Sequence, residues 1–215
     1  MPIGKLHIKV CGLTRLTDLP LLEAMGVDFA GMIFYPHSPR YMDNQQQASL
    51  AQAYAGHIRK VGVFVNASLQ EIEQAVKAYR LQGIQLHGEE SPEFCHLLRE
   101  KGLEIIKAIP VSATGFPDIR AYETACDYFL FDTASPYKGG TGKRFDWQKL
   151  DAYQGNTPFF LSGGIGPMHV SEILSLRHPQ LYGVDINSRF ETAPGIKNLT
   201  QIKQFICQLN IALEA

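Results

Sequence analysis

The sequence predicts an α/β fold in which eight parallel strands close into a (β/α)8, or TIM, barrel. Short apolar runs rich in β-branched and aromatic residues recur along the 215 residues, as expected for buried parallel strands. Amphipathic segments with apolar residues at helical spacing separate these runs. No proline- or serine-rich linker, low-complexity tract or change in composition divides the chain, so residues 1–215 are expected to form a single barrel domain.

Eight runs have the length and composition of strands, which is the number that closes such a barrel. They are Leu6–Cys11, Phe29–Phe34, Val61–Val65, Gly83–His87, Glu104–Ile109, Tyr128–Asp132, Phe159–Ser162 and Gly183–Ile186.

Helical spacing of apolar residues predicts the helices between the strands and one that closes the ring. They are Leu16–Met25, Gln45–Ala55, Leu69–Tyr79, Pro92–Lys101, Pro167–Leu176 and Leu199–Leu213. The segment Ser112–Ala125 completes the set, although Gly115 and Pro117 near its start oppose a helix there.

Composition excludes several classes of protein. A formal net charge of -1 gives no reason to expect attraction to nucleic acid or to an anionic membrane. The N-terminus MPIGKLHIKV lacks the apolar stretch of a signal peptide, and no run approaches the roughly 20 apolar residues of a membrane span, so a cytoplasmic protein is expected. The four cysteines are scattered without a C-x-x-C pair, which predicts reduced thiols and no metal site.

Two residues at predicted strand ends carry the chemistry that we expect at the C-terminal rim of the barrel. Cys11 ends the first strand before Gly12, and a thiolate there is able to accept a carbon-bound proton if a cation such as Lys9 or the substrate's own charge lowers its pKa. Asp132 ends the sixth strand, where a carboxylic acid is able to donate a proton. A buried apolar cysteine and a structural carboxylate are the alternatives.

Glycine-rich loops after three strands predict a lid and a phosphate site. The loop after Asp132 contains Gly139, Gly140, Thr141 and Gly142, which are typical of a segment that closes over a ligand. Gly163 and Gly164 follow the seventh strand, where backbone N–H groups and a helix N-terminus are able to hold an anion. Asn187–Arg189 follow the eighth strand, and barrels often place phosphate after strands seven and eight.

Three further polar residues at strand ends are candidate substrate ligands. Arg40 is suited to a carboxylate through its planar guanidinium group, although a lone arginine is more often a surface residue. His87 either orients the substrate or is a satisfied core histidine. Asp185 lies on the eighth strand and is a candidate to accept hydrogen bonds from substrate hydroxyls or from neighbouring loops.

The ordered motifs KVCGLT, GMIFYPHSPR, GVFVN, QLHG, FDT with GGTG and FDW, LSGGI, and GVDINS with PGIK closely resemble the phosphoribosylanthranilate isomerase family over essentially the whole chain. The resemblance implies a cofactor-free Amadori rearrangement of N-(5-phosphoribosyl)anthranilate in tryptophan biosynthesis. It implies Cys11 as general base, Asp132 as general acid and Arg40 as the contact to the anthranilate carboxylate. His87 and Asp185 match pocket positions of the family, and the loops at Gly163–Gly164 and Asn187–Arg189 match its phosphate-binding loops.

The chain departs from the family pattern after the eighth strand. Asn187–Glu191 stand where Ser-Ser-Gly-Val-Glu is common, so Arg189 replaces a usual glycine and puts the local backbone conformation in question. Asn198 stands where aspartate is usual, which is expected to alter a helix cap rather than the chemistry. A direct phosphate contact from Arg189 is a further expectation.

Three alternatives remain beside this interpretation. A dual-substrate sugar isomerase of histidine and tryptophan synthesis would share the barrel, but such enzymes typically have aspartate in place of Cys11. Indole-glycerol-phosphate synthase needs a catalytic lysine and acidic partners that the sequence does not place. A noncatalytic phosphate-sugar-binding barrel would have no need of both proton-transfer residues. The expected ligand is a small phosphorylated anthranilate sugar, and a monomer is expected over a dimer.

Overall fold

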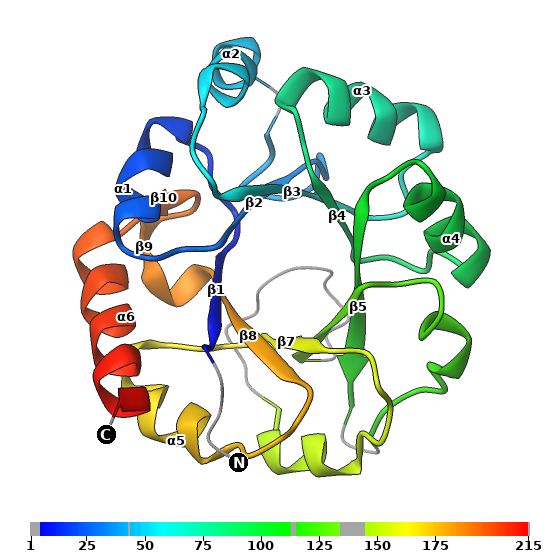
Figure 1. Ribbon diagram of the computed structural model, residues 1–215. Coiled ribbons are helices and arrows are strands. Elements are labelled where there is room, and N and C mark those ends of the chain that lie inside the picture. The colour runs from blue at the N-terminus through cyan, green and yellow to red at the C-terminus, as the bar shows by residue number, and fades with distance from the viewer. Residues whose placement is uncertain (1–4, 43, 113–114, 134–144, 215) are drawn as a thin grey trace.

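The computed structural model describes residues 5–42, 44–112, 115–133 and 145–214. Eight parallel strands pair in chain order and close into a barrel, with β1 hydrogen-bonded to both β2 and β8. Figure 1 looks along this barrel and shows the helices arranged around it. The strands are β1 (His7–Val10), β2 (Phe29–Ile33), β3 (Arg59–Phe64), β4 (Gly83–Leu86), β5 (Glu104–Val111), β6 (Tyr128–Thr133), β7 (Phe159–Leu161) and β8 (Leu181–Ile186).

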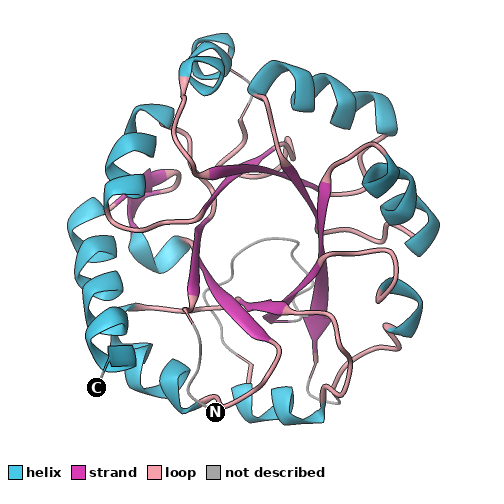
Figure 2. Cartoon of the chain, in the orientation of Figure 1, coloured by secondary structure: helices cyan, strands magenta, loops and turns pink. Residues whose placement is uncertain are grey.

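The predicted (β/α)8 barrel is therefore confirmed, and each predicted strand overlaps an observed one. Helices and short 3-10 turns alternate with the strands, as Figure 2 shows by colour. The α-helices are α1 (Leu19–Ala24), α2 (Gln45–Ala53), α3 (Leu69–Tyr79), α4 (Pro92–Glu100), α5 (Val170–Ser175) and α6 (Leu199–Glu214). The 3-10 turns are η1 (Leu16–Asp18), η2 (Arg120–Tyr122), η3 (Trp147–Ala152), η4 (Pro167–His169) and η5 (Ser188–Phe190).

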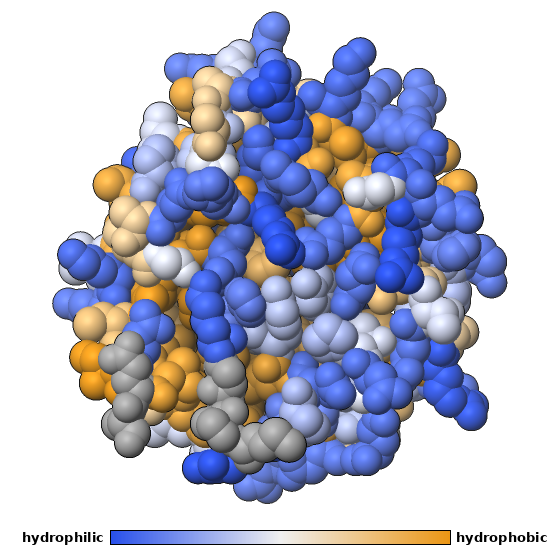
Figure 3. Space-filling model, in the orientation of Figure 1, coloured by the Kyte–Doolittle hydropathy of each residue, from blue (hydrophilic) through white to orange (hydrophobic). Residues whose placement is uncertain are grey.

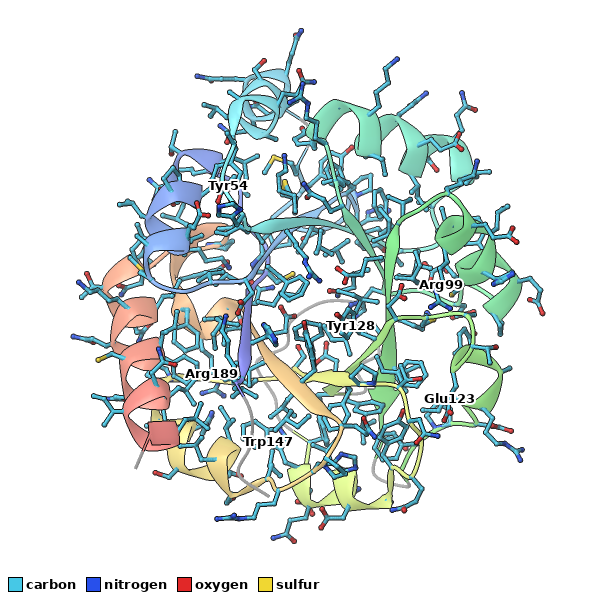
Figure 4. The ribbon with its side chains drawn as sticks, viewed as in Figure 1. Tyr54, Arg99, Glu123, Tyr128, Trp147 and Arg189 are labelled. Atoms are coloured by element: carbon cyan, nitrogen blue, oxygen red, sulfur yellow. The ribbon has the colours of Figure 1, made fainter. Side chains whose placement is uncertain are left out.

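The hydrophobic core has two parts. The larger part joins the outer faces of the strands to the helices. The smaller part draws only on strand residues, and its member Tyr128 lies near the centre of the ring of strands in Figure 4. The buried members of this inner cluster are Phe29, Val61, Ile106, Ala108, Tyr128, Leu130 and Phe160. Side chains thus fill the barrel interior below the rim, so a ligand has room only above them.

Helix starts follow from short polar side chains that accept backbone hydrogen bonds. Ser68 and Glu71 form a reciprocal capping box at the start of α3, with the Ser68 side chain accepting from the Glu71 backbone N–H. At the start of α6, Asn198 Oδ1 accepts from the Gln201 backbone N–H at 3.1 Å. The departure from the usual aspartate at Asn198 therefore preserves a helix cap.

The expected helix over Ser112–Ala125 is wrong. In the described part of this segment, residues 112 and 115–125, the single turn η2 is the one helical element, after a bridge between Ser112 and Gly115. Glycine and Pro117 disfavour helical backbone at the start of the segment. A two-stranded hairpin of β9 (Glu191–Ala193) and β10 (Ile196–Lys197) was not expected, and it follows η5.

The face turned to the viewer in Figure 3 is largely hydrophilic, with hydrophobic residues visible in smaller areas among the hydrophilic ones. In the described ranges, no helix is both long and apolar enough to cross a membrane. The predicted lid residues Gly139, Gly140, Thr141 and Gly142 lie outside the described residues.

Candidate active site

A cavity of about 470 Å³ opens where the strands end at their C-terminal rim. This volume is in the range of pockets that bind small molecules. Residues from all eight strands or the loops after them line it, and among these are the five residues predicted to carry catalysis and substrate binding: Cys11, Arg40, His87, Asp132 and Asp185. The structure thus brings Cys11 and Asp132 to one mouth of the barrel.

Cys11 directly follows β1, and its thiol is buried against a cation. Lys9 lies two residues earlier and so points to the same side of the strand, with its ammonium group fully buried and 2.8 Å from Asp185 Oδ1. Burial raises the pKa of Cys11, and the positive charge of Lys9 opposes that rise. Gly31 on β2 makes the space, since a Cβ there would lie 2.8 Å from the Cys11 Sγ.

Lys9 and Asp185 form a buried ion pair below the cavity. Burial alone would lower the pKa of Lys9, but Asp185 and Cys11 raise it above its ordinary value. Burial also raises the pKa of Asp185, against the opposing charge of Lys9. The raised pKa of Lys9 favours its charged form, whereas the raised pKa of Asp185 favours its neutral form. The 2.8 Å contact supports the state in which both groups are ionised. Ser162 Oγ lies 3.4 Å from the other Asp185 oxygen.

Asp132 lies within β6 and is held by two neighbours. Its Oδ1 accepts from the Thr133 backbone N–H at 2.7 Å, and its Oδ2 lies 3.5 Å from His87 Nε2. Both side chains are about one-fifth exposed, at 22% and 23%. A group that lines the cavity and keeps some contact with solvent is well placed to exchange protons with a ligand.

Arg40 lines the cavity, but most of its guanidinium group is already engaged. Its Nη2 donates to Glu191 Oε2 at 2.6 Å and its Nε donates to Glu191 Oε1 at 2.9 Å. Lys197 Nζ also donates to Glu191, at 2.7 Å. Although burial raises the pKa of Glu191, the bonds from Arg40 and Lys197 hold it below its ordinary value. Among the described residues no hydrogen bond involves Arg40 Nη1, so this nitrogen is available to a ligand acceptor.

The loop after β7 holds the two glycines that the sequence predicts to bind phosphate, and both have left-handed backbone. Gly163 and Gly164 have φ values of +85° and +68°, which L side chains rarely adopt. A Cβ at Gly163 would lie 2.9 Å from Asp132 Oδ1 and 2.5 Å from Thr133 Oγ1. Within the described residues, neither glycine N–H donates a hydrogen bond, so both amides are available to an anion.

The loop after β8 contributes Asn187 and Ser188 to the cavity lining. Arg189 is not among the lining residues, and in Figure 4 it lies between the barrel and α6. Its side chain packs toward Gly166, where a Cβ would lie 3.0 Å from Arg189 Cδ. Arg189 belongs to η5 with an ordinary negative φ, so the expected backbone conflict from replacing glycine does not arise.

Sequence reasoning missed Gln85, Glu191 and Lys197 as parts of the site. Gln85 lies two residues before His87 and also lines the cavity, so the period of two along a strand was the available signal. The roles of Glu191 and Lys197 depend on the hairpin after η5, which no local pattern indicated. Among the described residues no cluster of three His, Cys, Asp or Glu side chains is arranged to hold a metal ion.

Comparison with known proteins decides the family. The model of the N-(5'-phosphoribosyl)anthranilate isomerase family matches residues 8–208. The chain belongs to this family. The isomerase of Parabacteroides distasonis is 43% identical over 206 residues, covering 94% of this chain and 92% of that protein.

Solved structures of the family share this barrel. The phosphoribosyl anthranilate isomerase from Thermus thermophilus superposes with a TM-score of 0.83 at 30% identity, covering 96% of this chain and 100% of that one. A phosphoribosyl anthranilate isomerase in complex with reduced 1-(o-carboxyphenylamino)-1-deoxyribulose 5-phosphate gives a TM-score of 0.77 at 30% identity, over 96% and 99% of the two chains.

Proposed function

We propose that the protein is an aldose-ketose isomerase of tryptophan biosynthesis. It converts N-(5-phosphoribosyl)anthranilate to 1-(2-carboxyphenylamino)-1-deoxyribulose 5-phosphate by an Amadori rearrangement. The observation that carries this proposal is the cavity at the C-terminal rim, which is lined by Cys11, Asp132 and the available amides of Gly163 and Gly164. Family membership supports the same reaction.

The reaction needs a proton donor at the ring oxygen of the sugar, and we assign this role to Asp132. Its O–H donates to the ring oxygen while the C1–O bond breaks and the anthranilate nitrogen forms a C=N bond to C1. The sugar opens to a protonated Schiff base, and Asp132 is left as a carboxylate. His87 Nε2, 3.5 Å away, faces the oxygen that then carries charge.

Removal of the C2 proton follows, and we assign it to Cys11. Burial disfavours its thiolate, whereas Lys9 and the positive charge of the Schiff base favour the thiolate. Transfer of the C2 proton to sulfur gives an enolamine, and tautomerisation to the ketone finishes the reaction. Proton transfers alone accomplish these steps, so the chemistry calls for no redox or metal cofactor.

Binding contacts follow the same geometry. The amides of Gly163 and Gly164, together with the Asn187–Arg189 loop, are assigned to the phosphate, although Arg189 acts there only if its side chain moves. Arg40 Nη1 is assigned to the anthranilate carboxylate, and Asp185 to a hydroxyl of the sugar. A lid role for Gly139–Gly142, a cytoplasmic location and a monomeric state stay predictions.

Replacement of the two assigned residues tests the function. Cys11→Ala and Asp132→Asn are each expected to fold and to lose about 10²- to 10⁴-fold in kcat. Loss of anthranilate-sugar fluorescence measures turnover, and far-UV circular dichroism checks folding. Wild-type protein that binds the substrate without turning it over would instead indicate a noncatalytic sugar-binding barrel, and a folded variant with near wild-type kcat would reject that residue's role.

A further inference from the structure

Gln85 is a polar residue buried inside the barrel, on the wall of the cavity. It is 1% exposed and belongs to β4. Because side chains alternate along a strand, Gln85 points to the same side as His87, one layer deeper. A buried amide is unfavourable unless its hydrogen bonds are made, so the partners of Gln85 indicate its role.

The amide nitrogen of Gln85 determines which ring nitrogen of His87 carries the proton. Gln85 Nε2 lies 2.9 Å from His87 Nδ1. With the amide in this orientation its nitrogen donates, so Nδ1 accepts, and the proton of the neutral imidazole then resides on Nε2. That nitrogen is the one that lies 3.5 Å from Asp132 Oδ2.

We propose that Gln85 is a positioning residue of the isomerisation, which holds His87 in the tautomer that presents Nε2–H to Asp132. The proposal rests on the role assigned to Asp132 as proton donor. When Asp132 gives its proton to the ring oxygen, the carboxylate that remains accepts the hydrogen bond from Nε2–H. The opposite tautomer would place two acceptors face to face at that moment, because Nε2 would carry a lone pair.

The other end of the amide has a role in binding. Among the described residues, Gln85 Oε1 is buried and accepts no hydrogen bond. It belongs to a cavity wall that also holds Ser162 and Asp185. A buried acceptor without a partner is unusual in folded proteins, and a hydroxyl of the bound sugar is a donor of the right chemistry. Gln85 thereby links substrate binding to the orientation of His87.

Two replacements of similar length separate these roles. Gln85→Glu keeps an acceptor for the sugar hydroxyl, but its carboxylate accepts from Nδ1–H and so imposes the opposite tautomer on His87. Gln85→Met removes both the donor and the acceptor. We expect kcat to fall at least tenfold in both variants and KM to rise several-fold in Gln85→Met only. Gln52→Met, on exposed α2, is the matched control with unchanged constants.

Imidazole ¹⁵N NMR reads the tautomer directly, with the His87 signals assigned by their loss in His87→Gln. The expected result is Nε2–H in the wild-type protein and Nδ1–H in Gln85→Glu. Wild-type His87 protonated on Nδ1 would overturn the proposal even if no variant folds, and so would full kcat in folded Gln85→Glu. Full kcat in Asp132→Asn would instead refute the role of Asp132, whichever tautomer is found.

Discussion

At the scale of single residues, the site depends on charges that are buried in opposing pairs. Lys9 pairs with Asp185, and both Arg40 and Lys197 pair with Glu191. Burial raises the pKa of Cys11 in the ligand-free protein, and the charge of Asp185 adds to this rise, while Lys9 and Lys197 oppose it. The thiolate to which we assign C2 deprotonation is then favoured mainly once the substrate has supplied its own positive charge.

The raised pKa predicts how Cys11 reacts with iodoacetamide. Its alkylation rate is expected to rise with pH with a midpoint above the ordinary thiol value of 9.0, because only the thiolate reacts. Mass spectrometry of the modified peptides measures the rate, and exposed Cys207 is the internal reference for reagent reactivity. A midpoint below 9.0 for Cys11 would mean that Lys9 outweighs burial.

The raised pKa of Cys11 also makes the stability of the protein depend on pH. A thiol whose pKa is raised on folding stabilises the native state while it is protonated, and this contribution is lost as pH rises through the folded pKa. The free energy of unfolding of wild-type protein is thus expected to fall relative to that of Cys11→Ala at alkaline pH. Urea titrations at neutral and alkaline pH check this difference.

At the scale of elements, helix caps and strand ends decide where side chains enter the cavity. The cap at Asn198 fixes the start of α6, directly after the β9–β10 hairpin that carries Glu191 and Lys197. Asn198→Ala is expected to reduce the free energy of unfolding by about 1 kcal/mol, because the Gln201 N–H loses its acceptor.

Asn198→Asp is the matched control, since aspartate also accepts at a helix start. Urea denaturation measures both variants. Equal stability of Asn198→Ala and wild-type protein would show that the observed hydrogen bond contributes nothing.

The sequence was sufficient for the strands and for the gathering of the predicted catalytic and substrate-binding residues around one cavity, for a physical reason. Buried parallel strands appear as short apolar runs, and their C-terminal ends converge, so Cys11 and Asp132 could be placed at one rim from their strand positions alone. The helix predicted over Ser112–Ala125 was wrong because the apolar spacing of this segment did not outweigh its glycine and proline. The pairing of Arg40 with Glu191 could not be predicted, since it joins residues 151 positions apart through an unexpected hairpin.

At the scale of the whole molecule, the interior of the barrel supports the floor of the cavity. Phe160 packs edge-on against Phe29 with ring centroids 5.2 Å apart, and Tyr128 and Tyr182 surround the same rings. This aromatic layer joins β2, β6, β7 and β8 across the barrel. It fills the space that would otherwise let the strand ends shift relative to one another.

Phe160→Ala is expected to cost about 3–5 kcal/mol of stability, because it opens a void that surrounding strands fill only in part. For a chain of this length the loss corresponds to a fall in Tm of roughly 6 to 20 °C. Differential scanning calorimetry measures it. Met168→Ala, at a side chain that is 83% exposed, is the control and should change stability by no more than about 0.5 kcal/mol. Equal changes of Tm in Phe160→Ala and Met168→Ala would contradict the packing role of this aromatic layer.

The central claim is that Asp132 opens the sugar and Cys11 then removes the C2 proton. Single-turnover rates with substrate deuterated at C2 test this order most directly. Cys11→Ser weakens the base, so C2 deprotonation should become rate-limiting and deuterium should slow the reaction several-fold. Asp132→Asn weakens the acid, so ring opening should limit the rate and deuterium should leave it nearly unchanged. The reverse pattern would contradict the account.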